Sequence, residues 1–189
     1  NISRLASLGK IQHVINYDKY YTDVFTILSK KNRNNVAICG KSGVGKTAIA
    51  KNIANIINEK KCHVNFHDKT LMEMDFSKLV VGTPFKGAFE QKFYAIVEEA
   101  RTRGNYIFFI DNIHFLLNSN TKYAETDIET LLEVLFTDPS IQIVCTTTPA
   151  SYSKLQKKSL LGKYLQEVTI EEPTIEECVD ILHKIKSQY

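Results

Sequence analysis

Residues 40–47 read GKSGVGKT, with glycines at 40, 43 and 45 and a closing Lys-Thr pair. The pattern follows the apolar run VAIC at 36–39 and precedes TAIAKNIANII, so it joins a predicted strand to a predicted helix. Glycines allow backbone conformations closed to other residues, so successive N–H groups can converge on one anion. The dipole of the following helix favours the same charge. The stretch therefore predicts a polyphosphate-binding loop.

The chemistry of the loop indicates ATP with Mg²⁺. Lys46 is expected to reach the β- and γ-phosphates, and the Thr47 hydroxyl is expected to bind Mg²⁺, which takes phosphate oxygens as its other partners. The alternative is a glycine-rich turn that matches by chance. The predicted nucleotide contacts in the loop are Gly40, Lys41, Ser42, Gly43, Val44, Gly45, Lys46 and Thr47.

A second motif, YIFFIDNIHFLL at 106–117, predicts a buried parallel strand that ends in Asp111. In doubly wound α/β folds, ligands bind at the carboxyl ends of the strands. Asp111 is therefore the predicted Walker B aspartate and the second protein group at Mg²⁺.

The residue after Asp111 is Asn112. Many ATPases of this design place glutamate there, where it accepts a proton from the attacking water. An amide can orient water, but it cannot take a proton at neutral pH. Loss of a general base costs about 10²- to 10⁴-fold in rate. The alternative is that a remote acid, such as Glu133 or Asp127, substitutes.

The chain has 189 residues, 43% of them hydrophobic, which predicts one domain with a well-packed core. The 24 basic and 21 acidic residues are interspersed, so we expect no nucleic-acid partner. Cys39 and Cys145 end apolar runs and are expected to be buried, reduced thiols. We see neither an apolar stretch long enough for a bilayer nor a signal peptide. These features predict an intracellular protein, in the cytoplasm or an organelle lumen, without membrane contact.

Alternating patterns predict an α/β fold, a three-layer sandwich with a five-stranded parallel sheet of the P-loop NTPase type. Expected strands are 36–39, 70–75, 105–111, 141–147 and 167–170, and expected helices are 19–30, 46–59, 88–103, 124–136, 151–157 and 174–187.

The chain resembles the large subdomain of the first AAA+ module of the Clp ATPases, the ClpB, ClpC and ClpA unfoldases. The resembling segments are LASLGKIQHVINYDK at 5–19, KKNRNNVAICGKSGVGKTAIA at 30–50, LVVGTPFKGAFEQKF at 79–93, IFFIDNIHFLL at 107–117, IVCTTTPASY at 143–152 and EEPTIEECVDIL at 171–182. The resemblance implies that residues 1–189 form one large nucleotide-binding subdomain. The small helical lid subdomain and any second module then lie outside the chain.

The resemblance also implies roles for residues outside the two motifs. Val14, Ile15 and Ile181 correspond to adenine contacts, with ordinary core packing as the alternative. Thr147 corresponds to the residue that senses the γ-phosphate, although neighbouring threonines leave that assignment open by one position. Phe85 corresponds to the aromatic residue of a pore loop that grips polypeptide in a hexamer, with local packing as the alternative.

The chain departs from the family at one catalytic position. In Clp relatives, an arginine there reaches the γ-phosphate bound by the neighbouring subunit. The matching stretch is LLGKYLQEV, with Lys163, and no arginine follows Arg103. Lysine lacks the planar fork of arginine, which is worth about 10³- to 10⁵-fold in related reactions.

Together these features predict an ATP-binding Clp-type module that is weak in hydrolysis and acts in nucleotide-dependent assembly or regulation. Its expected partners are other Clp-type subunits in a homo- or hetero-hexamer, unfolded polypeptide and a peptidase ring. The alternatives are an active ATPase motor that unfolds proteins, with Lys163 and a remote acid substituting, and an AAA+ nucleic-acid loader.

Overall fold

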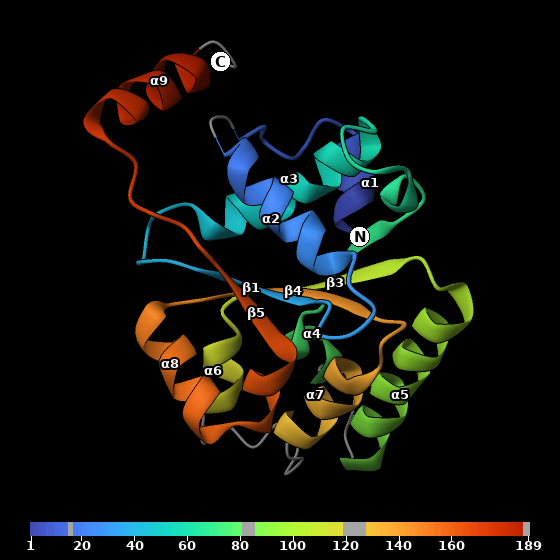
Figure 1. Cartoon of the computed structure of the whole chain (residues 1–189). Coiled ribbons are helices and arrows are strands. Elements are labelled where there is room, and N and C mark those ends of the chain that lie inside the picture. Colours follow the sequence, from blue (N-terminus) through green and yellow to red (C-terminus); the bar gives the residue numbers. More distant parts are fainter. Residues whose placement is uncertain (15–16, 81–85, 119–127, 187–189) are drawn as a thin grey trace.

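The computed structural model describes residues 1–14, 17–80, 86–118 and 128–186. Its strands form one parallel sheet in the order β2-β3-β4-β1-β5 (Figure 1). They are β1 (Asn35–Cys39), β2 (Thr70–Glu73), β3 (Tyr106–Ile110), β4 (Gln142–Thr147) and β5 (Leu165–Thr169). The predicted five-stranded parallel sheet is confirmed. Two strands end earlier than predicted. β2 ends at Glu73 instead of residue 75, and β3 ends at Ile110 instead of residue 111, so Asp111 directly follows its strand.

Helices cover both faces of the sheet, which confirms the three-layer sandwich (Figure 1). One face carries α1 (Ile2–Ser7), α2 (Asp18–Leu28) and α3 (Lys46–Asn58). The other carries α4 (Phe76–Val80), α5 (Lys86–Arg103), α6 (Ile113–Asn118), α7 (Ile128–Thr137) and α8 (Pro149–Lys158). Two 3-10 helices, η1 (Val64–Phe66) and η2 (Leu160–Tyr164), complete these layers. The short helices α1, α4 and α6 were not predicted, because five or six residues give too little periodicity to recognise.

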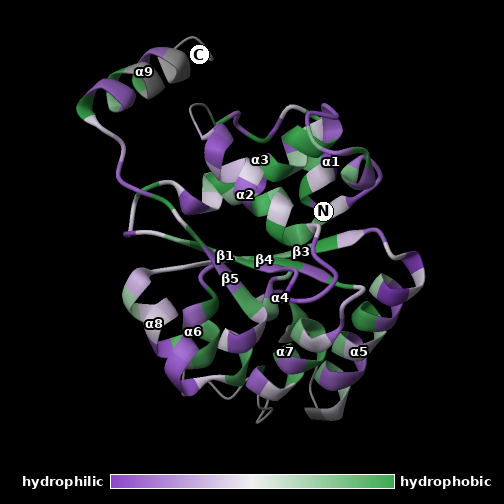
Figure 2. Cartoon of the chain, in the orientation of Figure 1, coloured by the Kyte–Doolittle hydropathy of each residue, from purple (hydrophilic) through white to green (hydrophobic). Residues whose placement is uncertain are grey.

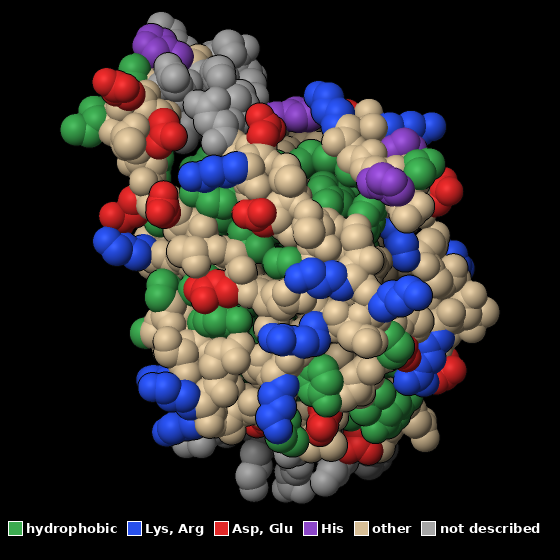
Figure 3. All heavy atoms as spheres, in the orientation of Figure 1, with side chains coloured by type: hydrophobic (Ala, Val, Ile, Leu, Met, Phe, Trp, Pro, Cys, Tyr) green, Lys and Arg blue, Asp and Glu red, His purple; other side chains and the backbone are tan. Residues whose placement is uncertain are grey.

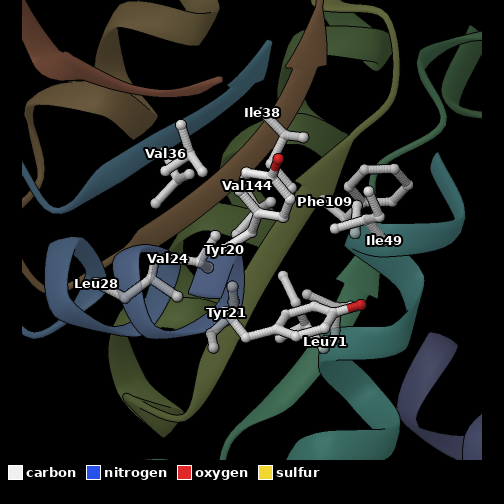
Figure 4. Packing of buried hydrophobic residues seen from close by; sticks show 14 of the residues in the cluster. Tyr20, Tyr21, Val24, Leu28, Val36, Ile38, Ile49, Leu71, Phe109 and Val144 are labelled. Carbon is white, nitrogen blue, oxygen red and sulfur yellow. The ribbon is translucent and has the colours of Figure 1, made fainter. Parts of the chain in front are cut away.

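Side chains along β1 point alternately to the two faces of the sheet, so this strand contributes to two hydrophobic cores. Val36 and Ile38 face α2 and α3, whereas Ala37 faces the core that α5, α7 and α8 complete. Figure 4 shows the first core, in which Val24 from α2 and Ile49 from α3 lie over the strands. Apolar residues accordingly concentrate in the strands and on the inward sides of the helices (Figure 2). Cys39 and Cys145 are buried free thiols, as predicted.

The order of the strands creates a position for a ligand between β1 and β4. These strands are neighbours, but the chain leaves β1 for α3 on one face of the sheet and leaves β4 for α8 on the other. At such a switch point the two connections diverge and open a crevice at the carboxyl ends of the strands. The GKSGVGKT loop lies at this crevice, since it begins where β1 ends.

The last helix, α9 (Ile175–Lys186), stands away from the two layers at the end of an extended connector (Figure 1). Its start is fixed by a reciprocal pair of hydrogen bonds. Thr174 N donates to Glu177 Oε2 at 2.8 Å, and Glu177 N donates to Thr174 Oγ1 at 3.2 Å. The start predicted near residue 174 is thereby confirmed. Over the residues that the structure describes, no helix combines the length and the apolar character that a membrane span requires.

Candidate nucleotide-binding site

The loop at 40–45 turns sharply between β1 and α3. Gly43 and Gly45 have φ angles of 87° and 89°, in the left-handed region that glycine adopts without strain. Gly45 caps the N-terminus of α3, so the first N–H groups of the helix face the crevice. Val44 is buried and anchors the middle of the loop, while Ser42 is exposed.

Gly40 is required for a different reason, since the base of the loop lies close to the end of β5. A Cβ atom at this position would lie 2.8 Å from Ile170 O and 3.0 Å from Val44 Cγ2. The backbone of Ile170 is itself fixed there, because its N–H donates to Cys39 O at 2.6 Å. Any side chain at position 40 would therefore collide with its neighbours unless the backbone shifted.

Two lysines of the loop have different environments. Lys46 is buried, and its Nζ donates to Lys41 O at 2.6 Å, which holds the cation against the backbone of the loop. Lys41 is exposed and forms an ion pair with Glu172 at 3.0 Å, on the connector to α9. Figure 3 shows acidic side chains gathered around that connector, where Glu171, Glu172 and Glu177 line a hollow. Of the two lysines, Lys46 thus has its charge held within the loop.

Asp111 lies beside the start of α3, as the sequence predicted. Thr47 Oγ1 lies 3.0 Å from both carboxylate oxygens of Asp111. Thr146 Oγ1, at the end of β4, donates to Asp111 Oδ1 at 2.5 Å and accepts from Asn112 N at 2.7 Å. The start of α3, the residue after β3 and the end of β4 therefore converge at the crevice.

The oxygen atoms at this point fit Mg²⁺ bound to a phosphate. A hydroxyl and a carboxylate are the hard donors that Mg²⁺ prefers, and the ion usually keeps only one or two protein ligands beside phosphate and water. Among the described residues, no group of three or more His, Cys, Asp and Glu side chains is placed to hold a metal ion by itself. Thr47 and Asp111 would thus hold the ion together with the phosphates of a nucleotide.

Thr147, the predicted sensor residue, is fully buried at the end of β4. Its hydroxyl lies 3.4 Å from His114 Nδ1. Burial and, next, the charge of Lys46 lower the pKa of His114, so its imidazole is neutral at pH 7. The structure therefore brings two threonine hydroxyls to the site, Thr146 against the carboxylate and Thr147 against the histidine.

His114 was not identified from the sequence. It lies on α6, three positions after Asp111, and that helix was not predicted. One signal was available in the sequence. His114 follows Asp111 by only three positions, so both residues must lie near the carboxyl end of β3.

Asn112 is half-buried, with a φ of 49°. Asparagine tolerates this left-handed conformation better than most residues that carry a side chain. Of the two acids considered as a substitute base, Glu133 is half-buried within α7 and Asp127 lies outside the described residues.

Lys163 lies far from the loop of its own chain. It is exposed on η2, which leads directly into β5, whereas the phosphate-binding loop lies at the opposite, carboxyl ends of the parallel strands. The five residues of β5 separate these ends by about 17 Å. Lys163 therefore lies away from the phosphate-binding loop of its own chain.

The predicted adenine and polypeptide contacts are only partly described. Val14 is half-buried and packs against the core that contains α2 and α3. Ile15 and Phe85 lie outside the described residues, and the description of Ile181 is limited to its backbone in α9.

The family model for the ATPase family associated with various cellular activities (AAA) matches residues 36–171. The chain belongs to the AAA ATPase family. The match begins in β1 and ends just beyond β5, so it covers the sheet except for the first residue of β1.

Relatives of this AAA chain include several Clp proteins. It is 31% identical over its whole length to the ATP-dependent Clp protease ATP-binding subunit ClpC of Staphylococcus epidermidis. It is 33% identical, over 97% of its length, to the chaperone protein ClpB of Oceanobacillus iheyensis. The chain covers 23% of each of these proteins, so it spans about a quarter of their length. The predicted resemblance to a Clp-type AAA+ module is confirmed.

Solved structures of Hsp104 share the fold. Hsp104 in a closed state with ATPγS and FITC-casein gives a TM-score of 0.88 at 24% identity, over all of this chain and 32% of that one. The S. cerevisiae Hsp104–ADP complex gives a TM-score of 0.83 at 24% identity, over 97% of this chain and 26% of that one. These values confirm the P-loop sandwich of the AAA family.

Proposed function

We propose that this chain is the ATP-binding large subdomain of a Clp-type AAA+ module, and that it binds ATP with Mg²⁺ but turns it over slowly. One observation carries the proposal. The phosphate-binding loop and Asp111 are assembled through Thr47, while the position beside that carboxylate holds Asn112.

Binding follows from the groups that line the crevice. The N-terminus of α3 and Lys46 supply positive charge for the β- and γ-phosphates. Mg²⁺, when bound, neutralises charge on the phosphate oxygens. Thr47 and Asp111 orient that ion, and the half-buried Val14 belongs to the segment proposed to contact adenine.

Slow turnover follows from what Asn112 cannot do. Its amide orients a water molecule but accepts no proton from it at neutral pH. Lys163 lies at the opposite end of β5 and can assist only the nucleotide of a neighbouring subunit, with a point charge in place of a bidentate fork. Both features lower the rate without touching the groups that bind phosphate.

Such a module would act in nucleotide-dependent assembly or regulation of a larger protein. We propose a homo- or hetero-hexamer of Clp-type subunits within the cell, which engages unfolded polypeptide through Phe85 and docks on a peptidase ring. The Clp relatives named above support this setting, since their names include a chaperone and a protease subunit.

ATP binding and turnover by the assembled full-length protein test the proposal, with any second module inactivated. We expect tight MgATP binding with turnover far below that of the Asn112→Glu variant. Asn112→Gln is the matched control, because it has the length of glutamate but no basic oxygen, and it should stay slow. Brisk turnover by the parent protein would contradict the proposal.

The second candidate is an active unfolding motor, favoured by His114. A neutral imidazole beside Thr147 is a group that can accept a proton, which Asn112 cannot do. A Lys46→Ala variant would distinguish the two functions. Loss of unfolding with assembly intact indicates a motor, whereas loss of assembly indicates a nucleotide-binding element.

A further inference from the structure

The segment that leads to Val14 has no helix or strand of its own. Residues 10–14 connect α1 to α2 in an irregular conformation, so backbone ladders do not fix their position. Ile11 and Val14 pack against the core only in part, since both side chains are half-buried. Some other interaction must hold this segment if it is to meet a purine in a defined place.

The polar residues of α3 supply that interaction. Asn52 and Asn55 are 3% and 4% exposed on a face that otherwise carries Ile49, Ile53 and Ile57. Burial of an amide without hydrogen bonds costs about 1 to 3 kcal/mol, so two such residues on an apolar face need partners.

Those partners form a chain that ends on the irregular segment. Asn52 Nδ2 donates to Tyr21 Oη at 2.9 Å, and Asn55 Nδ2 donates to Asn52 Oδ1 at 2.9 Å. Asn55 Nδ2 also donates to Ile11 O at 3.3 Å. Figure 4 shows the ring of Tyr21 with its hydroxyl directed toward α3. The chain of bonds therefore ties α2 and α3 to the backbone three residues before Val14.

The same helix carries the phosphate contacts. α3 begins at Lys46 and Thr47, and Asn55 lies nine positions after Lys46, about 14 Å along the helix axis. A helix packed into the core moves as a rigid rod, so it fixes the distance between its first turn and the carbonyl of Ile11. A second contact lies nearby, where His13 Nε2 is 3.4 Å from Glu59 Oε1.

We propose that Asn55, held in place by Asn52 and Tyr21, is a positioning residue that sets the purine-contacting segment at a fixed distance from the phosphate-binding loop. The inference rests on the proposed function, because it assigns Val14 to the purine of ATP. It predicts that Asn55 contributes to recognition of the base and not to recognition of the phosphates.

The test compares two ligands that share phosphates and differ in the purine nucleoside. The affinities of the full-length protein for ATP and for inorganic tripolyphosphate, both with Mg²⁺, are measured by calorimetry. We expect Asn55→Ala to weaken ATP binding about tenfold, the effect of losing one well-placed hydrogen-bonding anchor. Tripolyphosphate binding should stay within about twofold of the parent, because the first turn of α3 is unchanged.

Asn58→Ala is the matched control. Asn58 Nδ2 donates to Ser3 O at 3.1 Å, so it makes the same kind of bond from the same helix to the same N-terminal stretch, but outside the purine segment. This variant should bind both ligands as the parent does. Tyr21→Phe removes only the hydrogen bond between Asn52 and Tyr21, so it is the variant to test if Asn55→Ala does not fold. It should lower ATP affinity about twofold to fivefold without affecting tripolyphosphate.

The outcomes separate the two proposals. Equal losses of ATP and tripolyphosphate affinity, or no loss of either, would show that Asn55 only stabilises the fold and would overturn the inference alone. A parent protein that binds neither ligand would overturn the proposed function, and the inference with it.

Discussion

Thr47 Oγ1 lies 3.0 Å from both carboxylate oxygens of Asp111, although 64 positions separate these residues in the sequence. Thr47 lies in the first turn of α3, after the loop that leaves β1, and Asp111 directly follows β3. The contact therefore depends on the sheet itself and joins the two motifs into one site.

Thr47→Val should weaken nucleotide binding only when Mg²⁺ is present. Valine has nearly the same shape but no hydroxyl, so the ion loses one oxygen while the N–H groups of α3 remain. We expect ATP affinity to fall about tenfold or more in Mg²⁺ and to stay unchanged with EDTA. Titration of a fluorescent ATP analogue under both conditions measures the difference. Thr137→Val, which removes a hydroxyl bonded within α7, is the control. Equal losses with and without Mg²⁺ would instead indicate a distorted loop.

Gly40→Ala should destabilise the fold. The added Cβ would lie 2.8 Å from Ile170 O, a backbone atom that cannot move without disturbing the end of β5. Overpacking of this kind costs about 1 to 3 kcal/mol in the free energy of unfolding, which urea denaturation measures. Gly87→Ala is the matched substitution in open space, because its Cβ would meet nothing within 4 Å, and it should leave stability unchanged or slightly higher. A Gly40→Ala protein as stable as Gly87→Ala would show that the loop adapts.

Much of the fold could be predicted because its strands are buried on both faces. Asn35–Cys39 and Tyr106–Ile110 read as apolar runs, and they alternate with helical patterns that require parallel crossovers. Thr47 and Asp111 could be predicted as well, since Thr47 closes the GKSGVGKT motif and Asp111 directly follows the apolar run of β3.

The remaining contacts depend on side-chain directions that periodicity does not encode. His114 lies on a helix of six residues, too short to recognise, and its contact with Thr147 requires the pairing of β3 with β4. Asn55 reads as an ordinary polar residue in an amphipathic helix until its burial is known. The order of the strands likewise follows from packing between distant segments.

Replacement of Asn112 by alanine should cost stability, whereas replacement by glycine should not. The φ of 49° lies in the left-handed region, where alanine is strained by about 1 to 2 kcal/mol and glycine is not. Both variants keep the backbone N–H that donates to Thr146, so the comparison isolates the conformation. Urea denaturation of Asn112→Ala and Asn112→Gly should differ by about 1 kcal/mol in favour of glycine. Equal stabilities would mean that the turn relaxes when the asparagine side chain is removed.

His114 should make the folded protein less stable as the pH falls below neutrality. Burial, then the charge of Lys46, lowers its pKa from the usual 6.5, while Asp111 opposes the shift in part. Below about pH 6.5 the unfolded chain binds a proton at this imidazole that the folded chain does not, so stability falls as the pH decreases toward the folded pKa. Above pH 7 the imidazole is neutral in both states and contributes no slope.

His114→Gln removes that titration while its amide can still contact Thr147. Urea denaturation of the parent and the variant at pH 7.5 and pH 5.5 should show a smaller loss of stability in the variant. The difference can reach at most about 1.4 kcal/mol for each unit by which the pKa is lowered. Parallel losses in the two proteins would mean that the imidazole accepts its proton as readily in the folded state as in the unfolded one, and that the crevice beside Thr147 is open to water.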